Sequence, residues 1–132
     1  MSQPQVLLVE DEPDLLRALS VRLASIGLSC ATACNGLDAL AKVRAQRPDL
    51  IVTDLIMPEM DGYALCRSLH ADSRTASIPV VVLTAVPRRA LAQEAEGLHV
   101  ARVVHKPFDS SEFLSTVQDV LAAAPQGGLP HG

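Results

Sequence analysis

The 132-residue sequence is poor in aromatic residues, with no tryptophan, one tyrosine and two phenylalanines. Stacking of nucleobases and the sandwiching of a flavin both use aromatic rings, so the composition disfavours these functions. Basic residues are also outnumbered, 11 against 15 acidic ones, and the formal net charge is −4. Because nucleic acid and anionic membranes are bound by basic faces, we expect neither as a direct partner of this chain.

Long apolar runs and targeting segments are lacking as well. No stretch approaches the roughly 20 apolar residues of a membrane span. The first residues carry neither a basic region nor the long apolar segment of a signal peptide. Cys30, Cys34 and Cys66 form no C-x-x-C pair and are odd in number, which suits packing in a reducing compartment. We therefore expect a cytoplasmic location.

Apolar runs alternate with amphipathic segments along the chain. The runs predict buried strands at residues 5–9, 29–33, 50–53, 78–83 and 101–105, the second being the weakest. Apolar residues at helical spacing predict helices at residues 13–26, 37–43, 62–70, 87–96 and from 110 onward. This alternation predicts an α/β fold, a single parallel sheet with helices on both faces. We expect one domain at residues 1–124 and a flexible tail at 125–132.

Polar residues follow the predicted strands where the strands end. Glu10 and Asp11 follow the first strand, Asp54 the third, Thr84 the fourth and Lys106 the last. Parallel strands bring their carboxyl ends to one edge of the sheet, and ligands of open α/β sheets bind at that edge. Taken alone, Asp54 could merely begin a turn, as aspartate often does. The five residues together favour a functional site.

These side-chain types indicate a particular chemistry. Three neighbouring carboxylates repel one another, and one pKa would rise unless a cation neutralised the group. Mg²⁺, held by a few carboxylates with water in its other positions, would meet this need. A lysine ammonium and a threonine hydroxyl suit phosphate oxygens. A carboxylate nucleophile, a metal and a lysine are the parts needed to form and hydrolyse an aspartyl phosphate. Neither G-x-x-x-x-G-K-[ST] nor G-x-G-x-x-G, the nucleotide-binding loops, occurs in the sequence.

Four short motifs occur in order: Val9-Glu10-Asp11-Glu12, Asp54 with Met57-Pro58 and Met60-Asp61-Gly62, Leu83-Thr84-Ala85, and Lys106-Pro107-Phe108. With these spacings, residues 5–124 resemble the receiver domain of two-component response regulators. Each motif is weak alone, whereas all four in order are a strong signal. The resemblance implies a doubly wound, flavodoxin-like sheet of five strands in the order 2-1-3-4-5.

The resemblance also implies roles for the acidic residues. Asp54 would take a phosphoryl group from the phosphohistidine of a sensor histidine kinase or a phosphotransfer protein. Asp11, Asp54 and the main-chain carbonyl of Ile56 would hold Mg²⁺, with Glu10 acting directly or through water. The domain would then be a signalling domain that assists its own phosphorylation and dephosphorylation, and not an enzyme with an external substrate.

The remaining motifs complete the implied switch. Lys106 would pair with the phosphoryl oxygens, its peptide bond to Pro107 is expected to be cis, and Thr84 would move to bond the phosphoryl group. The added charge would bias a surface made by the fourth helix, the last strand and the fifth helix. A downstream protein or output domain would bind there, and a homodimer through this surface is left open.

The sequence departs from the family pattern at three positions. Val103 stands three residues before the lysine, where the family usually has tyrosine or phenylalanine that swings inward. Because valine cannot make a rotamer change of that size, we expect Val103 only to pack. Ile56 and Val86 are apolar where polar residues of the family help position the attacking water. We therefore predict slow intrinsic dephosphorylation.

Three other functions compete with this interpretation. A phosphatase of the haloacid-dehalogenase type would need a second aspartate two residues after the nucleophile, where Ile56 stands. A flavodoxin-like electron carrier is disfavoured by the scarce aromatics and the missing phosphate loop. A receiver-like module could also dock partners without accepting phosphate, although all the residues needed for acceptance are present.

Overall fold

The computed structural model describes residues 3–57, 59–94 and 98–123. Within these ranges the elements are β1 (Gln5–Val9), α1 (Pro13–Ser25), β2 (Ser29–Ala33), α2 (Gly36–Ala45), β3 (Leu50–Thr53), α3 (Gly62–Ala71), β4 (Val80–Thr84), α4 (Arg88–Glu94), β5 (Arg102–His105) and α5 (Ser110–Ala123). The tail predicted at residues 125–132 lies outside the described residues. Strand and helix alternate throughout, as the apolar runs predict.

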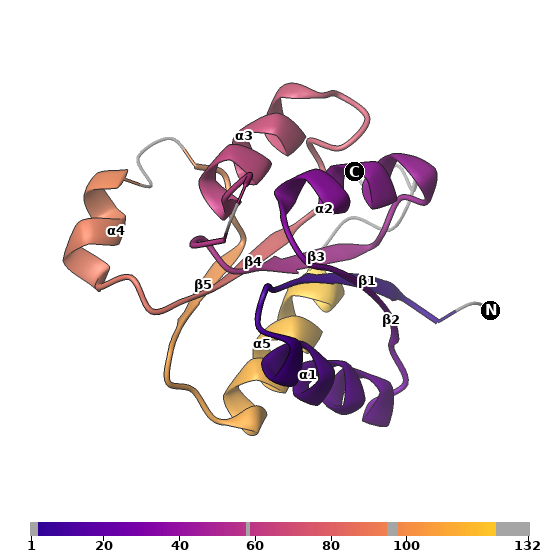
Figure 1. Cartoon of the computed structure of the whole chain (residues 1–132). Helices are drawn as coiled ribbons and strands as arrows, with labels where there is room; N and C mark the ends of the chain where they lie inside the picture. Colours follow the sequence, from indigo (N-terminus) through magenta and orange to yellow (C-terminus); the bar gives the residue numbers. More distant parts are fainter. Residues whose placement is uncertain (1–2, 58, 95–97, 124–132) are drawn as a thin grey trace.

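The strands of the described chain form one parallel sheet in the order β2-β1-β3-β4-β5. The predicted α/β fold and strand order are therefore confirmed. Helices α1 and α5 cover one face of the sheet and α2 and α3 the other, while α4 lies beside the β5 end (Figure 1). Every residue of β3 and β4 is buried because these central strands are covered on both faces.

Successive residues of a strand enter two different cores. Leu7 belongs to the cluster beneath α2 and α3, whereas Leu8 belongs to the cluster beneath α1 and α5. Phe113 of α5 is fully buried in the second cluster. Side chains of a strand point alternately to its two faces, so one apolar run supplies both cores. The strands are thereby held rigidly, and their carboxyl ends are fixed relative to one another.

Helices α2 and α3 each begin with a side-chain cap. The Oδ1 atom of Asn35 accepts a hydrogen bond from the backbone N–H of Asp38 at 2.8 Å, at the start of α2. Asp61 caps α3 in the same way, accepting from the N–H of Ala64 at 2.9 Å. Such caps satisfy backbone donors that have no partner within the helix. Both caps lie at the edge of the sheet where the strands end.

Helix α2 buries only some of its apolar residues. Leu37 is 53 % exposed and Ala41 is exposed too. Ala39, Leu40 and Val43 are buried. Both sets fit a helical period, so the sequence pattern alone does not fix how the helix is rotated about its axis.

Helix α4 is the shortest of the described helices and α5 is the longest. Helix α4 has seven residues within the described chain, and residues 95 and 96 of the predicted helix lie outside it. The longest helix, α5, has 14 residues. Among the described residues, no helix combines the length and the apolar composition that crossing a membrane requires.

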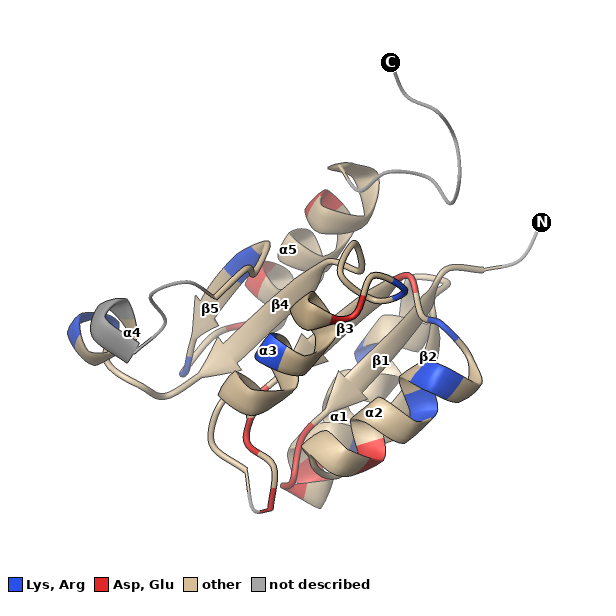
Figure 2. Cartoon of the chain, turned by 90° about the horizontal axis from the view of Figure 1, so that it is seen from above, with Lys and Arg blue, Asp and Glu red and all other residues tan. Residues whose placement is uncertain are grey.

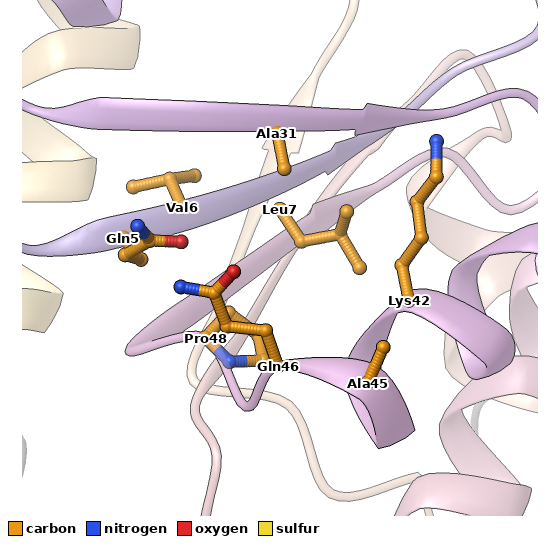
Figure 3. A pocket seen from close by; sticks show the side chains of 8 residues that line it. All are labelled: Gln5, Val6, Leu7, Ala31, Lys42, Ala45, Gln46 and Pro48. Carbon is orange, nitrogen blue, oxygen red and sulfur yellow. The ribbon is translucent and has the colours of Figure 1, made fainter.

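One outer edge of the sheet is formed by β2. The Nζ atom of Lys42, on α2, donates a hydrogen bond to the carbonyl of Thr32 on this strand. Figure 3 shows the Lys42 side chain beside a cavity of about 150 Å³ that also has Leu7, Ala31 and Pro48 in its lining. None of the predicted site residues lines this cavity. The predicted site residues lie elsewhere, at the carboxyl ends of the strands.

Candidate functional site

Asp54 follows β3 directly and is 7 % exposed. Its Oδ1 atom accepts hydrogen bonds from the backbone N–H groups of Leu55 at 2.6 Å and Ile56 at 3.3 Å. Its own N–H donates to the carbonyl of Val9 at 3.2 Å, which continues the pairing of β3 with β1. The chain thus holds one carboxylate oxygen with amides of the following loop and leaves Oδ2 for other groups.

Lys106 supplies the partner of that second oxygen. Its Nζ atom lies 2.8 Å from Oδ2 of Asp54 and 3.3 Å from Oε1 of Glu10. Burial lowers the pKa of Lys106, but the hydrogen bond to Asp54 and the charges of Glu10 and Asp54 outweigh it, so the pKa is raised. The ammonium is therefore charged at neutral pH. The peptide bond to Pro107 is cis, as expected from the family resemblance.

Glu10 is the most buried acid of the group, with an exposed fraction of 1 %. Its Oε2 atom accepts a hydrogen bond from the N–H of Glu12 at 3.2 Å. Burial raises the pKa of Glu10, and the charge of Asp54 adds to this, although Lys106 and the Glu12 amide oppose it. The negative charge of Glu10 is thus only partly compensated by the protein itself.

A third carboxylate joins these two. Oxygen atoms of Glu10, Asp11 and Asp54 all lie within 4.8 Å of one another, with Asp11 exposed and the other two buried. Figure 2 shows acidic residues gathered where β1 and β3 run into their loops. Carboxylate oxygens at such separations are the ligands that Mg²⁺ takes in proteins, and an exposed ligand leaves room for water. The donor set therefore fits a hard divalent cation.

Thr84 ends β4 and is fully buried. Its Oγ1 atom accepts a hydrogen bond from the N–H of Val86 at 3.0 Å. The N–H of Lys106 donates to the carbonyl of Thr84 at 2.8 Å, so these two predicted residues are joined through the backbone. The structure therefore brings Thr84 to the same edge as Lys106, with its hydroxyl engaged by its own loop.

One residue of the site was not given a role by the sequence. A Cβ atom on Gly62 would lie 2.1 Å from the carbonyl oxygen of Asp54 and 2.7 Å from Cα of Leu55. The N–H of Gly62 also donates to the carbonyl of Leu55 at 2.9 Å. Helix α3 therefore begins in direct contact with the backbone that carries Asp54, which only glycine allows. The signal was present in the Met60-Asp61-Gly62 motif, but a motif does not say what its glycine touches.

Two residues near Lys106 lie outside this constellation. Val103 is half-buried and packs against the core beneath α2 and α3, as expected of a packing residue. His105 is half-buried on the edge strand β5. Its ring is not among the candidate metal ligands found in the described residues, which are Glu10, Asp11 and Asp54.

Comparison with known proteins identifies this arrangement. The family model described as the response regulator receiver domain matches residues 6–118. The chain belongs to this family. A receiver domain of a signal transduction histidine kinase from Syntrophus aciditrophicus has a TM-score of 0.86 and 31 % identity, over 98 % of this chain and 95 % of that one. The resemblance stated from the motifs is confirmed, in preference to the phosphatase and electron-carrier alternatives.

Three further proteins are similar to this chain, one solved receiver domain and two curated transcriptional regulators. One, from a sensor histidine kinase of Pseudomonas aeruginosa, was solved with a magnesium ion coordinated in its active site cleft; its TM-score is 0.85 at 25 % identity, over 92 % of this chain and 100 % of that one. The DNA-binding dual master transcriptional regulator RpaA of Synechocystis is 33 % identical over 89 % of this chain and 49 % of its own length. A probable transcriptional regulator, ycf27, of Pyropia yezoensis is 35 % identical over 91 % of this chain and 48 % of its own. The receiver domain spans about half the length of these curated relatives.

Proposed function

We propose that this receiver domain accepts a phosphoryl group on Asp54 from the phosphohistidine of a sensor histidine kinase or a phosphotransfer protein. The observation that carries the proposal is the position of Lys106 Nζ, 2.8 Å from Oδ2 of Asp54 and 3.3 Å from Oε1 of Glu10. A charged ammonium beside a carboxylate nucleophile is suited to neutralise the oxygens of an incoming phosphoryl group.

The groups around Asp54 give its two carboxylate oxygens different roles. The amides of Leu55 and Ile56 hold Oδ1, so Oδ2 is the nucleophile. A bond forms between Oδ2 and phosphorus as the bond from phosphorus to the imidazole nitrogen breaks, and the electron pair of the broken bond stays on that nitrogen. Lys106 then pairs with a phosphoryl oxygen. Thr84 exchanges its hydrogen bond from Val86 for one donated to another phosphoryl oxygen.

We assign Mg²⁺ to the carboxylates of Asp11 and Asp54, the main-chain carbonyl of Ile56, and Glu10 directly or through water. When bound, Mg²⁺ neutralises the acidic cluster and withdraws charge from the phosphoryl oxygens. The buried Glu10, whose pKa is raised, supports the assignment because a nearby cation favours its charged form. The magnesium ion in the related Pseudomonas receiver domain supports it as well.

The phosphorylated domain would act through its surface. A phosphoryl group adds about −1.5 to −2 charges at neutral pH. The strands that supply Thr84 and Lys106 to the site, β4 and β5, lead directly into α4 and α5. We propose that a downstream protein or an output domain binds this surface, and that any homodimer uses it too. The two curated relatives named above are roughly twice as long as this domain, and both are named as transcriptional regulators. We place the domain at residues 1–124.

Phosphoryl transfer from acetyl phosphate tests the proposal. Wild-type protein and Asp54→Asn are incubated with acetyl phosphate and Mg²⁺, with and without EDTA, and intact masses are measured. We expect one added phosphoryl unit in the wild type with Mg²⁺ and none in Asp54→Asn. A wild-type mass unchanged with acetyl phosphate and with a phosphorylated kinase, or equal labelling of Asp54→Asn, would contradict the proposal. The domain would then be a docking module that works without phosphate.

A further inference from the structure

The turn between β2 and α2 contacts the loop between β3 and α3. The N–H of Gly36 donates a hydrogen bond to the carbonyl of Met60 at 3.0 Å. The Nδ2 atom of Asn35 donates to Oε2 of Glu59 at 3.4 Å, across 24 positions of sequence. Two consecutive residues of one turn are thus bonded to two consecutive residues of the loop that leaves Asp54.

The approach at Gly36 leaves no room for a side chain. A Cβ atom there would lie 2.6 Å from both the carbonyl oxygen and Cγ of Met60, and 2.9 Å from its Cβ. These separations are well below van der Waals contact. The Met60 side chain could rotate away, but its carbonyl oxygen belongs to the backbone. Any residue larger than glycine must therefore displace the loop itself.

The loop adopts a conformation that needs outside support. Glu59 has a φ of 65°, the left-handed region that residues other than glycine adopt infrequently. Such conformations persist when surrounding contacts impose them. Asn35 contributes on both sides, since its Oδ1 caps α2 at Asp38 while its Nδ2 reaches Glu59. The first turn of α2 is thereby tied to the strained part of the loop.

The same loop begins with the amides that hold Asp54. Leu55 and Ile56 donate to Oδ1 of Asp54, and Gly62 closes the loop by donating to the carbonyl of Leu55. We propose that Asn35 and Gly36 are positioning residues for phosphoryl acceptance. They fix the β3–α3 loop so that its amides hold Oδ1, and Oδ2, which pairs with Lys106, is the oxygen that reacts. This inference rests on the proposed role of Asp54.

Gly36→Ala tests the steric part, with Gly27→Ala as its control. Gly27 lies two residues after the end of α1 and has a φ of 84°, and a Cβ there would meet nothing within 4 Å. The control therefore strains the backbone far from the loop. Amide chemical shifts and hydrogen exchange of Leu55 and Ile56 are measured without metal, and melting temperatures are recorded. We expect faster exchange of both amides and shifted resonances in Gly36→Ala only.

The phosphorylation rate supplies a second measurement on the same variants. We expect Gly36→Ala to react with acetyl phosphate and Mg²⁺ on the order of tenfold more slowly than wild type, since a misplacement of about 1 Å can cost a hundredfold. Gly27→Ala should react at the wild-type rate even where its melting temperature falls as far. Equal effects of the two variants on amides and rate would overturn the proposal, and so would wild-type behaviour of Gly36→Ala.

Asn35→Asp tests the polar part without removing the helix cap. The aspartate can still accept from the N–H of Asp38, but it places a carboxylate beside that of Glu59. We expect a severalfold slower reaction and a disturbed Leu55 amide, and restoration of both by adding Glu59→Gln, whose amide can donate. Failure of the second change to restore them would contradict the role of this contact. If wild-type protein never accepted phosphate, the amide measurements would still decide the positioning role separately.

Discussion

Lys106 and Asp54 are 52 positions apart in the sequence, yet Nζ of one lies 2.8 Å from Oδ2 of the other. Both carboxylate oxygens of Asp54 are therefore engaged, Oδ2 by this ammonium and Oδ1 by two backbone amides. The arrangement is compact because β5 and β3 each flank β4 and end at the same edge.

Glu10 should make the metal-free protein less stable as pH rises. Its folded pKa is raised above the ordinary value of 4.5, so the folded state holds the proton more tightly than the unfolded chain. The associated stability is fully present below 4.5 and is lost as pH rises through the raised pKa. Relative to Glu10→Gln, the wild type should therefore lose stability over this range. Urea unfolding of both proteins in EDTA at several pH values measures the difference, and parallel curves would contradict it.

Magnesium should stabilise the fold through the acidic cluster. A ligand that binds only the folded state at a hundred times its dissociation constant adds about 2.7 kcal/mol. We expect the melting temperature to rise with Mg²⁺ and to return with EDTA. Asp11→Asn should weaken this response, because Asp11 contributes to the cluster. Asp14→Asn is the matched control, since Asp14 is exposed and pairs with Arg17 instead; an equal loss of response in both variants would argue against the assigned site.

Dephosphorylation should be slow in the wild type. Ile56 is 61 % exposed and Val86 is half-buried beside the site. The apolar side chain of neither residue can hydrogen-bond an attacking water. We expect phosphorylated protein to persist well beyond seconds in Mg²⁺, and Ile56→Asn to speed its decay roughly tenfold by orienting water. Val21→Asn is the control, because Val21 is a similarly exposed apolar residue on α1. Decay of the wild type within seconds, followed by intact mass, would show the prediction to be wrong.

Gly62→Ala should disturb both stability and chemistry. The added Cβ would overlap the carbonyl of Asp54, and forcing an extra carbon into packed structure costs about 1–3 kcal/mol. Because that backbone carries the acceptor, we also expect phosphorylation to be largely lost. Val6→Ala, a truncation in the core at the other end of β1, lowers stability without touching the site. If both variants accepted phosphate equally at matched stability, the contact would be merely structural.

The sequence was sufficient to predict the order of the elements and the residues that converge at the strand ends. Apolar runs and the polar residues that terminate them are local features, and parallel pairing brings those ends together. The sequence did not predict which of the adjacent acids Glu10 and Asp11 is buried. Glu10 is buried because its N–H still pairs with the carbonyl of Ala33, which continues the sheet by one residue, while Asp11 turns outward.

The contacts between loops were beyond sequence reasoning. The close approach of Gly36 to Met60 joins two turns that no periodicity relates. The rotation of α2, which leaves Leu37 exposed and buries Ala39, depends on the same kind of tertiary contact. Local patterns identify which residue types are available, but they do not encode which loop lies against which.

The hydrogen bond from Lys42 to Thr32 bears on whether copies of the protein aggregate through the edge of the sheet. The carbonyl of Ala33, the next residue, accepts from the N–H of Glu10, and successive carbonyls of a strand point to opposite sides, so the carbonyl of Thr32 faces away from β1. An unpaired strand edge is a template on which another chain can extend the sheet, and a lysine placed there discourages this. We therefore expect the Lys42 side chain, which fills this acceptor, to disfavour edge-to-edge aggregation. Truncating it would leave the chemistry of Asp54 intact while making concentrated solutions prone to fibrous deposits.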